Sequence, residues 1–121
     1  FYGASSLVDV GLYVGGHGVM CAIANLVPHL ALGIYEAASE GDWKKASRLN
    51  SQILELIDAL RLPARSNWAP TVATYKWIMK ELGVIDGDRV FAPLQPLTEE
   101  ERAQLKERAL PLVRNSWPES R

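Results

Sequence analysis

Cysteine is almost absent from this chain of 121 residues: Cys21 is the only one, so no disulfide can form within the chain. Secreted domains of this size often depend on disulfides, and we therefore expect a reducing compartment, either the cytoplasm or one such as the mitochondrial matrix. Cys21 lies in the apolar run from Val19 to Ile23, which favours a buried, unreactive thiol. The alternative, a catalytic thiol assisted by His17, requires an electropositive setting.

An excess of positive charge and long apolar runs are also lacking. The 13 Lys and Arg residues are balanced by 14 Asp and Glu residues, which argues against a nucleic-acid binder that works by bulk charge. No apolar run approaches the roughly 18–20 residues of a membrane span. A hydrophobic fraction of 48% excludes a disordered chain. The length allows one globular domain.

Charge is scarce in the first part of the chain. Residues 1–35 contain one charged side chain, Asp9, whereas residues 36–121 contain the other 26. We expect the nearly uncharged part to be buried. The later part is typical of amphipathic helices with solvated faces.

The first part predicts an α/β arrangement. Its apolar residues recur at helical spacing and indicate a helix from about Ser6 to Val14, with Gly15-Gly16 as its end: Leu7, Val10, Gly11 and Val14. The run Val19–Ile23 predicts a strand buried on both faces. Phe1-Tyr2 is interpreted as the end of a preceding strand, and the order strand, helix, strand indicates an α/β fold.

The second part predicts four helices. They cover Leu30 to Glu40, a stretch from Asp42 to Pro63, a stretch from Pro70 to Gly83, and a last helix that presents Leu105, Ala109 and Leu112. Thr98 and Glu101 form a capping box for the last helix, and Pro111 is expected to end or kink it. One strand cannot form a sheet, so the chain is interpreted as part of something larger.

Local motifs for chemistry are weak. The glycines of Gly15-Gly16-His17-Gly18 precede the predicted strand instead of following it, which argues against a phosphate-binding loop. His17 and His29 lack the spacing and the companions of a metal site. All five lysines lie on polar helix faces, unlike a Schiff-base lysine in a dry pocket.

An ordered series of motifs resembles the dihydrodipicolinate synthase/N-acetylneuraminate lyase family. Gly15 to Met20, with Ala24-Asn25 and Pro28, is similar to the family's G-G-x-G-V-I-S-x-x-A-N-x-x-P stretch. Further matches follow at the family's spacing up to about Val113: Tyr35–Ala38, Gly41–Ala46, Tyr75–Trp77, Lys80–Gly83, Pro93-Leu94, Pro96-Leu97 and Thr98–Arg102.

The resemblance implies the C-terminal part of a (β/α)8 barrel followed by a helical region. A whole barrel needs about 250 residues. Residues 1–40 would be the last part of the barrel, with Phe1 to Ser5 at the end of strand seven and Val19–Ile23 as strand eight. Residues 41–113 would be the C-terminal helical region, and residues 114–121 a tail.

The resemblance also implies an activity. Family members are similar in binding pyruvate or another 2-oxo acid as a lysine Schiff base, with no metal or other cofactor. The lysine and a tyrosine would lie upstream of Phe1, so this chain alone is expected to be inactive. The implied partners are the missing N-terminal part of the barrel, the 2-oxo acid and further copies in a homotetramer, without nucleic acid or membrane.

Four residues are candidates for substrate binding by this resemblance. Gly3 matches a glycine whose backbone faces the 2-oxo acid. Met20 matches an apolar residue that lines the pyruvate methyl side, with plain core packing as an equal alternative. Ser5 and Ser6 match positions that are acidic in sialic-acid lyases.

Departures from the family leave the substrate open. Dihydrodipicolinate synthases usually have two aspartates where this chain has Ala4-Ser5, and sialic-acid lyases have a serine at the position of Ala22. Residues 63–74 also depart from the usual short connection. A small 2-oxo acid aldolase, a hydratase-aldolase or a synthase would all fit. The alternative from another class is a non-enzymatic helical interaction domain.

Overall fold

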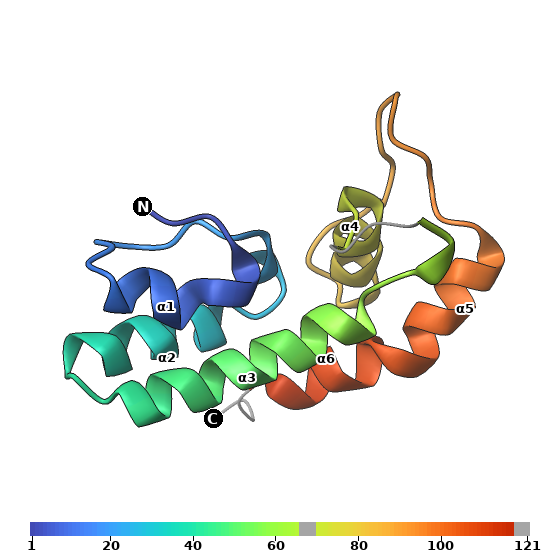
Figure 1. Cartoon of the computed structure of the whole chain (residues 1–121). Coiled ribbons are helices and arrows are strands. Elements are labelled where there is room, and N and C mark those ends of the chain that lie inside the picture. Colours follow the sequence, from blue (N-terminus) through green and yellow to red (C-terminus); the bar gives the residue numbers. More distant parts are fainter. Residues whose placement is uncertain (66–69, 118–121) are drawn as a thin grey trace. The chain divides into compact units, whose positions relative to one another are not determined.

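A computed structural model describes residues 1–65 and 70–117 of the chain (Figure 1). Helices dominate these residues, and no strand occurs among them. The elements are η1 (Ser5–Leu7), α1 (Val8–Tyr13), η2 (Ala22–Asn25), α2 (Pro28–Ser39), α3 (Trp43–Ala59), η3 (Pro63–Arg65), α4 (Val72–Glu81), α5 (Glu99–Arg108) and α6 (Leu110–Ser116), where η is a 3-10 helix. None of the helices in the described ranges has the length and apolarity needed to cross a membrane.

The chain forms two compact units, Phe1–Glu55 and Leu56–Arg121, and the division falls within α3. The division at residue 40, between the last part of the barrel and the helical region, follows family boundaries and stays a prediction. Part of the predicted tail is helical, because α6 runs through Arg114 to Ser116. Residues 118–121 of that tail lie outside the described residues, as do residues 66–69 of the connection at 63–74.

The first unit is built on α1 and α2, which pack against each other (Figure 1). The predicted apolar stripe of the first helix is wrong in register, because Leu7, Val10 and Val14 are exposed. Leu7 closes the 3-10 turn η1 with non-helical φ and ψ angles, so the α-helical period starts only at Val8. Val8, Leu12 and Ile23 fill the core in place of the predicted residues.

The predicted strand Val19–Ile23 is also wrong for this chain. Only Val19 pairs, in a single parallel bridge to Tyr2, and the chain turns into η2 at Ala22. A parallel strand is buried on both faces only where other elements cover both faces of its sheet. Here one face of the two paired segments is uncovered, so the side chain of Met20 is 79% exposed and that of Phe1 is 94% exposed. The expectation that residues 1–35 are buried throughout is therefore wrong.

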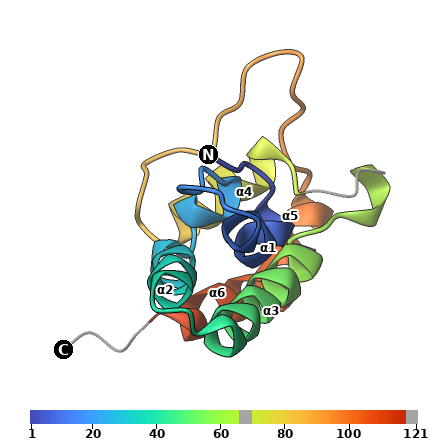
Figure 2. The ribbon, with the colours of Figure 1, turned by 60° about the vertical axis from the view of Figure 1, so that its left-hand side comes forward.

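Capping residues that can be recognised in the sequence stand at the ends of helices in the second unit. Thr71 accepts a hydrogen bond from the Thr74 N–H at the start of α4, and Gly83 follows α4 with a φ of 73°, which favours glycine. The capping box of α5 is confirmed: the Thr98 side chain accepts from the Glu101 N–H, and the Glu101 carboxylate accepts from the Thr98 N–H. The long connection between α4 and α5 extends away from both helices in two views (Figures 1 and 2).

The last predicted helix is two helices. α5 ends at Arg108 and α6 begins at Leu110, and Pro111 lies in the first turn of α6, where its missing N–H needs no partner within the helix. The break changes the buried face, so Leu110 and Val113 are buried while the predicted Leu112 is exposed. Leu105 and Ala109 are buried, as predicted.

A largely buried ion pair joins η3 to α5 within the second unit. Arg65 donates from Nε and NH2 to the two carboxylate oxygens of Glu101, at 2.6 Å each. The same guanidinium donates to the carbonyl oxygens of Gln95 at 2.9 Å and Pro96 at 2.7 Å. The hydrogen bonds from Arg65 hold the pKa of Glu101 below its usual value, against the opposing effect of burial. The connection before α5 is thereby fixed to η3.

Candidate active site

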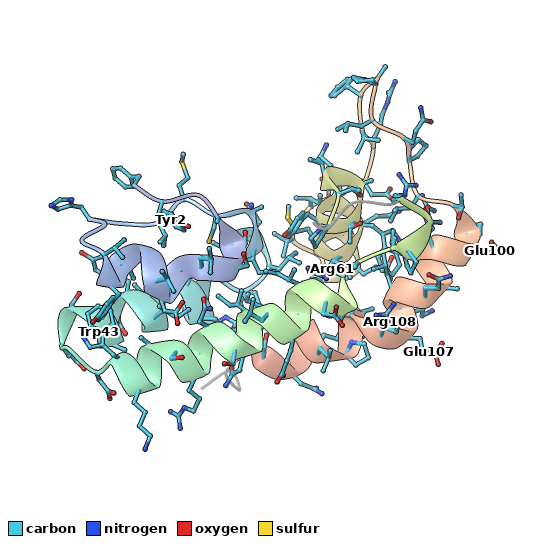
Figure 3. All side chains as sticks on the ribbon, viewed as in Figure 1. Tyr2, Trp43, Arg61, Glu100, Glu107 and Arg108 are labelled. Atoms are coloured by element: carbon cyan, nitrogen blue, oxygen red, sulfur yellow. The ribbon has the colours of Figure 1, made fainter. Side chains whose placement is uncertain are left out.

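Two short extended segments, Phe1–Gly3 and Gly18–Met20, run parallel in the first unit. The Tyr2 N–H donates to the Gly18 carbonyl at 3.0 Å, and the Met20 N–H donates to the Tyr2 carbonyl at 2.9 Å. Tyr2 lies over α1 (Figure 3), where a Cβ on Gly11 would lie 2.6 Å from its ring. A glycine at position 11 is therefore what allows this pair of segments to lie on α1.

Two candidates from the sequence, Gly3 and Met20, meet where these segments end. A Cβ on Gly3 would lie 3.7 Å from the carbonyl oxygen of Met20, so the two residues lie side by side. Gly3 is exposed, as is the thioether of Met20. Because the segments are parallel, Gly3 and Met20 lie at the same, carboxyl edge of the pair. Sites in (β/α)8 barrels form at that edge.

The other two candidates, Ser5 and Ser6, lie in η1 directly after the first segment. The Ser5 hydroxyl oxygen accepts a hydrogen bond from the Ile23 N–H at 3.4 Å. The Ser6 carbonyl accepts one from Asn50 Nδ2 at 3.2 Å. Both serines are half-buried. The structure thus connects Ser5 to the chain that follows Met20, and it connects Ser6 to α3.

Asn50 is a residue of this region that the sequence analysis missed. Its side chain lies on the buried face of α3, between the fully buried residues Ala46 and Ile53. The signal is visible in the sequence, because an amide interrupts an otherwise apolar face at positions 46, 50, 53 and 57. Buried polar side chains of this kind are normally hydrogen-bonded to something specific.

Cys21 is buried beside Ser5. Burial raises the pKa of the Cys21 thiol, while hydrogen bonds from the Ala24 N–H and the Ser5 side chain partly oppose that effect. A raised pKa keeps the thiol protonated, and the thiolate is the nucleophilic form. The environment thus supports the structural interpretation of Cys21. His17, its suggested partner, is exposed.

The described part of the chain offers neither a cluster of metal-ligating side chains nor a buried lysine. No group of three or more His, Cys, Asp or Glu side chains able to hold a metal ion lies within residues 1–65 and 70–117. None of the five lysines is buried. Two of them serve the connection before α5: Lys76 Nζ donates to the Arg89 carbonyl at 2.7 Å, and Lys80 Nζ lies 3.3 Å from Asp88 Oδ1. A desolvated lysine nucleophile is therefore not among the described residues.

Comparison with known proteins places the chain in a family. The family model "Dihydrodipicolinate synthetase family" matches residues 1–110. The chain is 35% identical over 104 residues to an uncharacterised DapA-like lyase of Halobacterium salinarum, covering 86% of this chain and 32% of that protein. It is 35% identical over 92 residues to a 4-hydroxy-tetrahydrodipicolinate synthase of Neisseria gonorrhoeae, covering 76% of this chain and 29% of that protein.

A solved structure shares the fold. The dihydrodipicolinate synthase of Bacteroides thetaiotaomicron superposes with a TM-score of 0.77 at 21% identity, over 93% of this chain and 36% of that one. The chain thus spans about a third of the length of the proteins it matches. It has the fold of the C-terminal part of a (β/α)8 barrel and the helical region that follows, and it belongs to the dihydrodipicolinate synthetase family.

Proposed function

We propose that this chain is the C-terminal part of a lyase or aldolase that binds pyruvate or another small 2-oxo acid as a lysine Schiff base. The observation that carries the proposal is the meeting of Gly3 and Met20 at the carboxyl edge of two parallel segments. In a (β/α)8 barrel this edge surrounds the substrate. The family's lyase relationship supports the same class of reaction.

The proposed chemistry requires a lysine from outside this chain. A deprotonated lysine amine adds to the keto carbon of the 2-oxo acid, and loss of water gives an imine. The protonated imine withdraws electrons from the adjacent carbon, so a C–C bond there can form or break. None of the five lysines in the chain is buried. The reactive amine would therefore belong to the remaining part of the barrel, and this chain by itself would be inactive.

Each candidate residue has a distinct role in the proposal. Gly3 has no side chain, so a carboxylate or keto group can approach its backbone. Met20 presents an exposed apolar side chain that would form the wall beside the methyl group of pyruvate. Ala4, Ser5 and Ser6 carry no charge, which favours a small substrate over a polyol held by acidic side chains. Assembly into a homo-oligomer is part of the proposal by family resemblance.

Trapping with borohydride tests the proposal. Purified protein is incubated with pyruvate and sodium borohydride, and its intact mass is compared with that of a sample without pyruvate. The isolated 121-residue chain should acquire no adduct, whereas the full-length polypeptide that carries these residues should acquire one on a single lysine. A cooperatively folding 13.4 kDa monomer, with no adduct in the longer polypeptide either, would instead support the non-enzymatic interaction domain.

Met20→Glu tests the wall of the site. In the full-length polypeptide this substitution puts a carboxylate beside the proposed methyl position and should abolish adduct formation, without unfolding the protein, because position 20 is exposed. Leu54→Glu is the matched control: Leu54 is an exposed apolar residue of α3 in the same unit, and the adduct should form normally. Undiminished adduct formation in Met20→Glu would show that Met20 does not line the site.

A further inference from the structure

We infer that Asn50 is a positioning residue of the proposed 2-oxo acid site and that it acts through the backbone of Ser6. The inference rests on the proposed function. Asn50 lies on α3 with 5% of its surface exposed. Its Nδ2 donates to the Ser6 carbonyl at 3.2 Å, across 44 positions of the chain. Both residues lie in the first unit, Phe1–Glu55.

Only one end of the Asn50 side-chain amide has a hydrogen-bond partner among the described residues. A carbonyl can only accept, so the contact with Ser6 requires the NH2 end of the amide to face it. The Oδ1 end is then buried without a hydrogen-bond partner among the described residues. A buried acceptor without a donor is unfavourable, and an apolar side chain of similar size would avoid that cost. The hydrogen bond to the Ser6 carbonyl is thus what asparagine provides at position 50 and an apolar residue would not.

The tethered segment has little else to hold it. None of the three residues of η1, Ser5–Leu7, is buried, so this turn has no apolar side chain anchored in the core. Its polar contacts are the Leu7 N–H to the Ala4 carbonyl at 3.1 Å, the Ser5 hydroxyl to the Ile23 N–H and the Cys21 thiol, and Asn50 Nδ2 to the Ser6 carbonyl. The first of these is internal to the turn. Ser5 and Asn50 are therefore the two links from the turn to the rest of the unit.

This turn begins two residues after Gly3 and contains Ser5 and Ser6. Together, Gly3, Ser5 and Ser6 are three of the four proposed substrate contacts. Without the Asn50 amide, the turn is held from the η2 side only, and Ser6 can move away from α3. A displacement of about 1 Å at a binding segment can change the rate or the affinity by up to about 100-fold. The expected consequence is weaker binding of the 2-oxo acid in a protein that remains folded.

The test replaces Asn50 by leucine in the full-length polypeptide. The pyruvate concentration that gives half-maximal trapped adduct should rise about 10-fold or more. The yield at saturating pyruvate should remain unchanged, because the lysine is elsewhere, and so should the thermal midpoint. Hydrogen exchange followed by mass spectrometry should show faster exchange in the peptide containing residues 4–7. A purely structural residue would instead lower the thermal midpoint without changing the half-saturation point.

Two variants of α3 serve as controls. Ser51→Ala removes a side-chain hydrogen bond to the Ser47 carbonyl on the exposed face of the helix and should change neither readout. Ile53→Val trims a fully buried neighbour and should lower stability without changing half-saturation. Should Asn50→Leu fail to fold, Asn50→Ala removes the donor without adding bulk, and the same shift is expected.

The outcomes separate the two proposals. If the unsubstituted protein forms no adduct, the proposed function is wrong, whatever happens at Asn50. If the unsubstituted protein forms the adduct, and the Asn50 variants match it in half-saturation and in exchange at residues 4–7, the inference about Asn50 is wrong and the function stands.

Discussion

The two units of this chain are held together by different forces. Residues 1–35 of the first unit contain one charged side chain, and several of its large apolar side chains are exposed: Phe1, Val10, Tyr13, Val14, Met20 and Leu32. The second unit, Leu56–Arg121, contains all five ion pairs found among the described residues. Its long connection, residues 84–97, is fixed by charge at several points.

This difference bears on where the proposed site lies. The second unit pairs several of its charged groups internally, chiefly around Arg65, Asp88 and Arg102. The first unit carries the candidate site and leaves apolar surface exposed, which is costly unless another surface covers it. The turn Ser5–Leu7, which contains two candidate site residues, is linked to the rest of this unit by a few hydrogen bonds. The Ile23 N–H donates to Ser5, and Asn50 donates to the Ser6 carbonyl. The four predictions below test this contrast.

Arg65→Ala should have the largest effect. It leaves the Glu101 carboxylate buried without its partner and removes two donors to the carbonyls of Gln95 and Pro96. Breaking a buried ion pair typically costs about 3–5 kcal/mol, and the side chains here are 17% and 10% exposed, so a loss of about 3 kcal/mol is expected. Native-state hydrogen exchange of the amides in α5 measures the loss of local stability.

Arg61→Ala is the matched control within the same unit. Arg61 pairs with Asp58 at 3.6 Å, with side chains 46% and 73% exposed. Exposed pairs contribute at most about 0.5–1 kcal/mol. Equal losses for the two arginines would contradict the view that the second unit depends on its buried pair.

Acid should weaken the second unit through Glu101. Its pKa is lower in the folded chain than in the unfolded chain, chiefly because of the hydrogen bonds from Arg65. The resulting stability is fully present above the unfolded pKa of about 4.3 and is lost as the pH falls through the folded value. The effect should be smaller than that of Arg65→Ala, because a protonated Glu101 still accepts hydrogen bonds. Urea unfolding between pH 7 and pH 3 measures it, and Glu101→Gln should flatten that dependence.

Gly11→Ala tests the tight packing of the first unit. The new Cβ would lie 2.6 Å from the ring of Tyr2, whose backbone is fixed by two hydrogen bonds to the second extended segment. Such overpacking costs about 1–3 kcal/mol, partly offset by about 1 kcal/mol of helix propensity. We expect a net loss of about 1 kcal/mol and faster exchange of the Met20 amide, which the Tyr2 carbonyl protects.

Gly33→Ala provides the comparison on α2. Its Cβ would meet only the end of the flexible Leu49 side chain, at 3.2 Å, so helix propensity should dominate and stability should stay equal or rise slightly. If both alanine variants behave alike, the close approach of Tyr2 to α1 does not determine the packing of the first unit.

Local signals were the part of this structure that the sequence predicted well. Thr98 with Glu101, and Gly83, mark helix ends because capping acts within a few residues. The strand Val19–Ile23 failed because a strand depends on neighbours that a local pattern does not contain. The ion pair between Arg65 and Glu101 joins residues 36 positions apart, which no periodicity reveals.

The candidate site was predictable only in part, and only by resemblance. Gly3 and Met20 carry no chemistry that a pattern could recognise, yet the structure places them side by side. Their proposed roles remain predictions. Asn50 was missed because a single amide on an apolar helix face is a weak signal until its partner, the Ser6 carbonyl, is known.

Glu99→Gln should have the smallest effect, because Arg102, the partner of Glu99, also pairs with the more buried Asp88. Arg102 lies 3.2 Å from Glu99, which is 90% exposed, and 3.0 Å from Asp88, which is 17% exposed. Losing the exposed pair should cost about 0.3 kcal/mol. Asp88→Asn should cost more, because it also removes the pair with Lys80 that fixes the connection before α5. Exchange of the amides at residues 84–97 distinguishes the two variants, and a larger change in Glu99→Gln would show that solvent exposure does not rank the ion pairs of this unit.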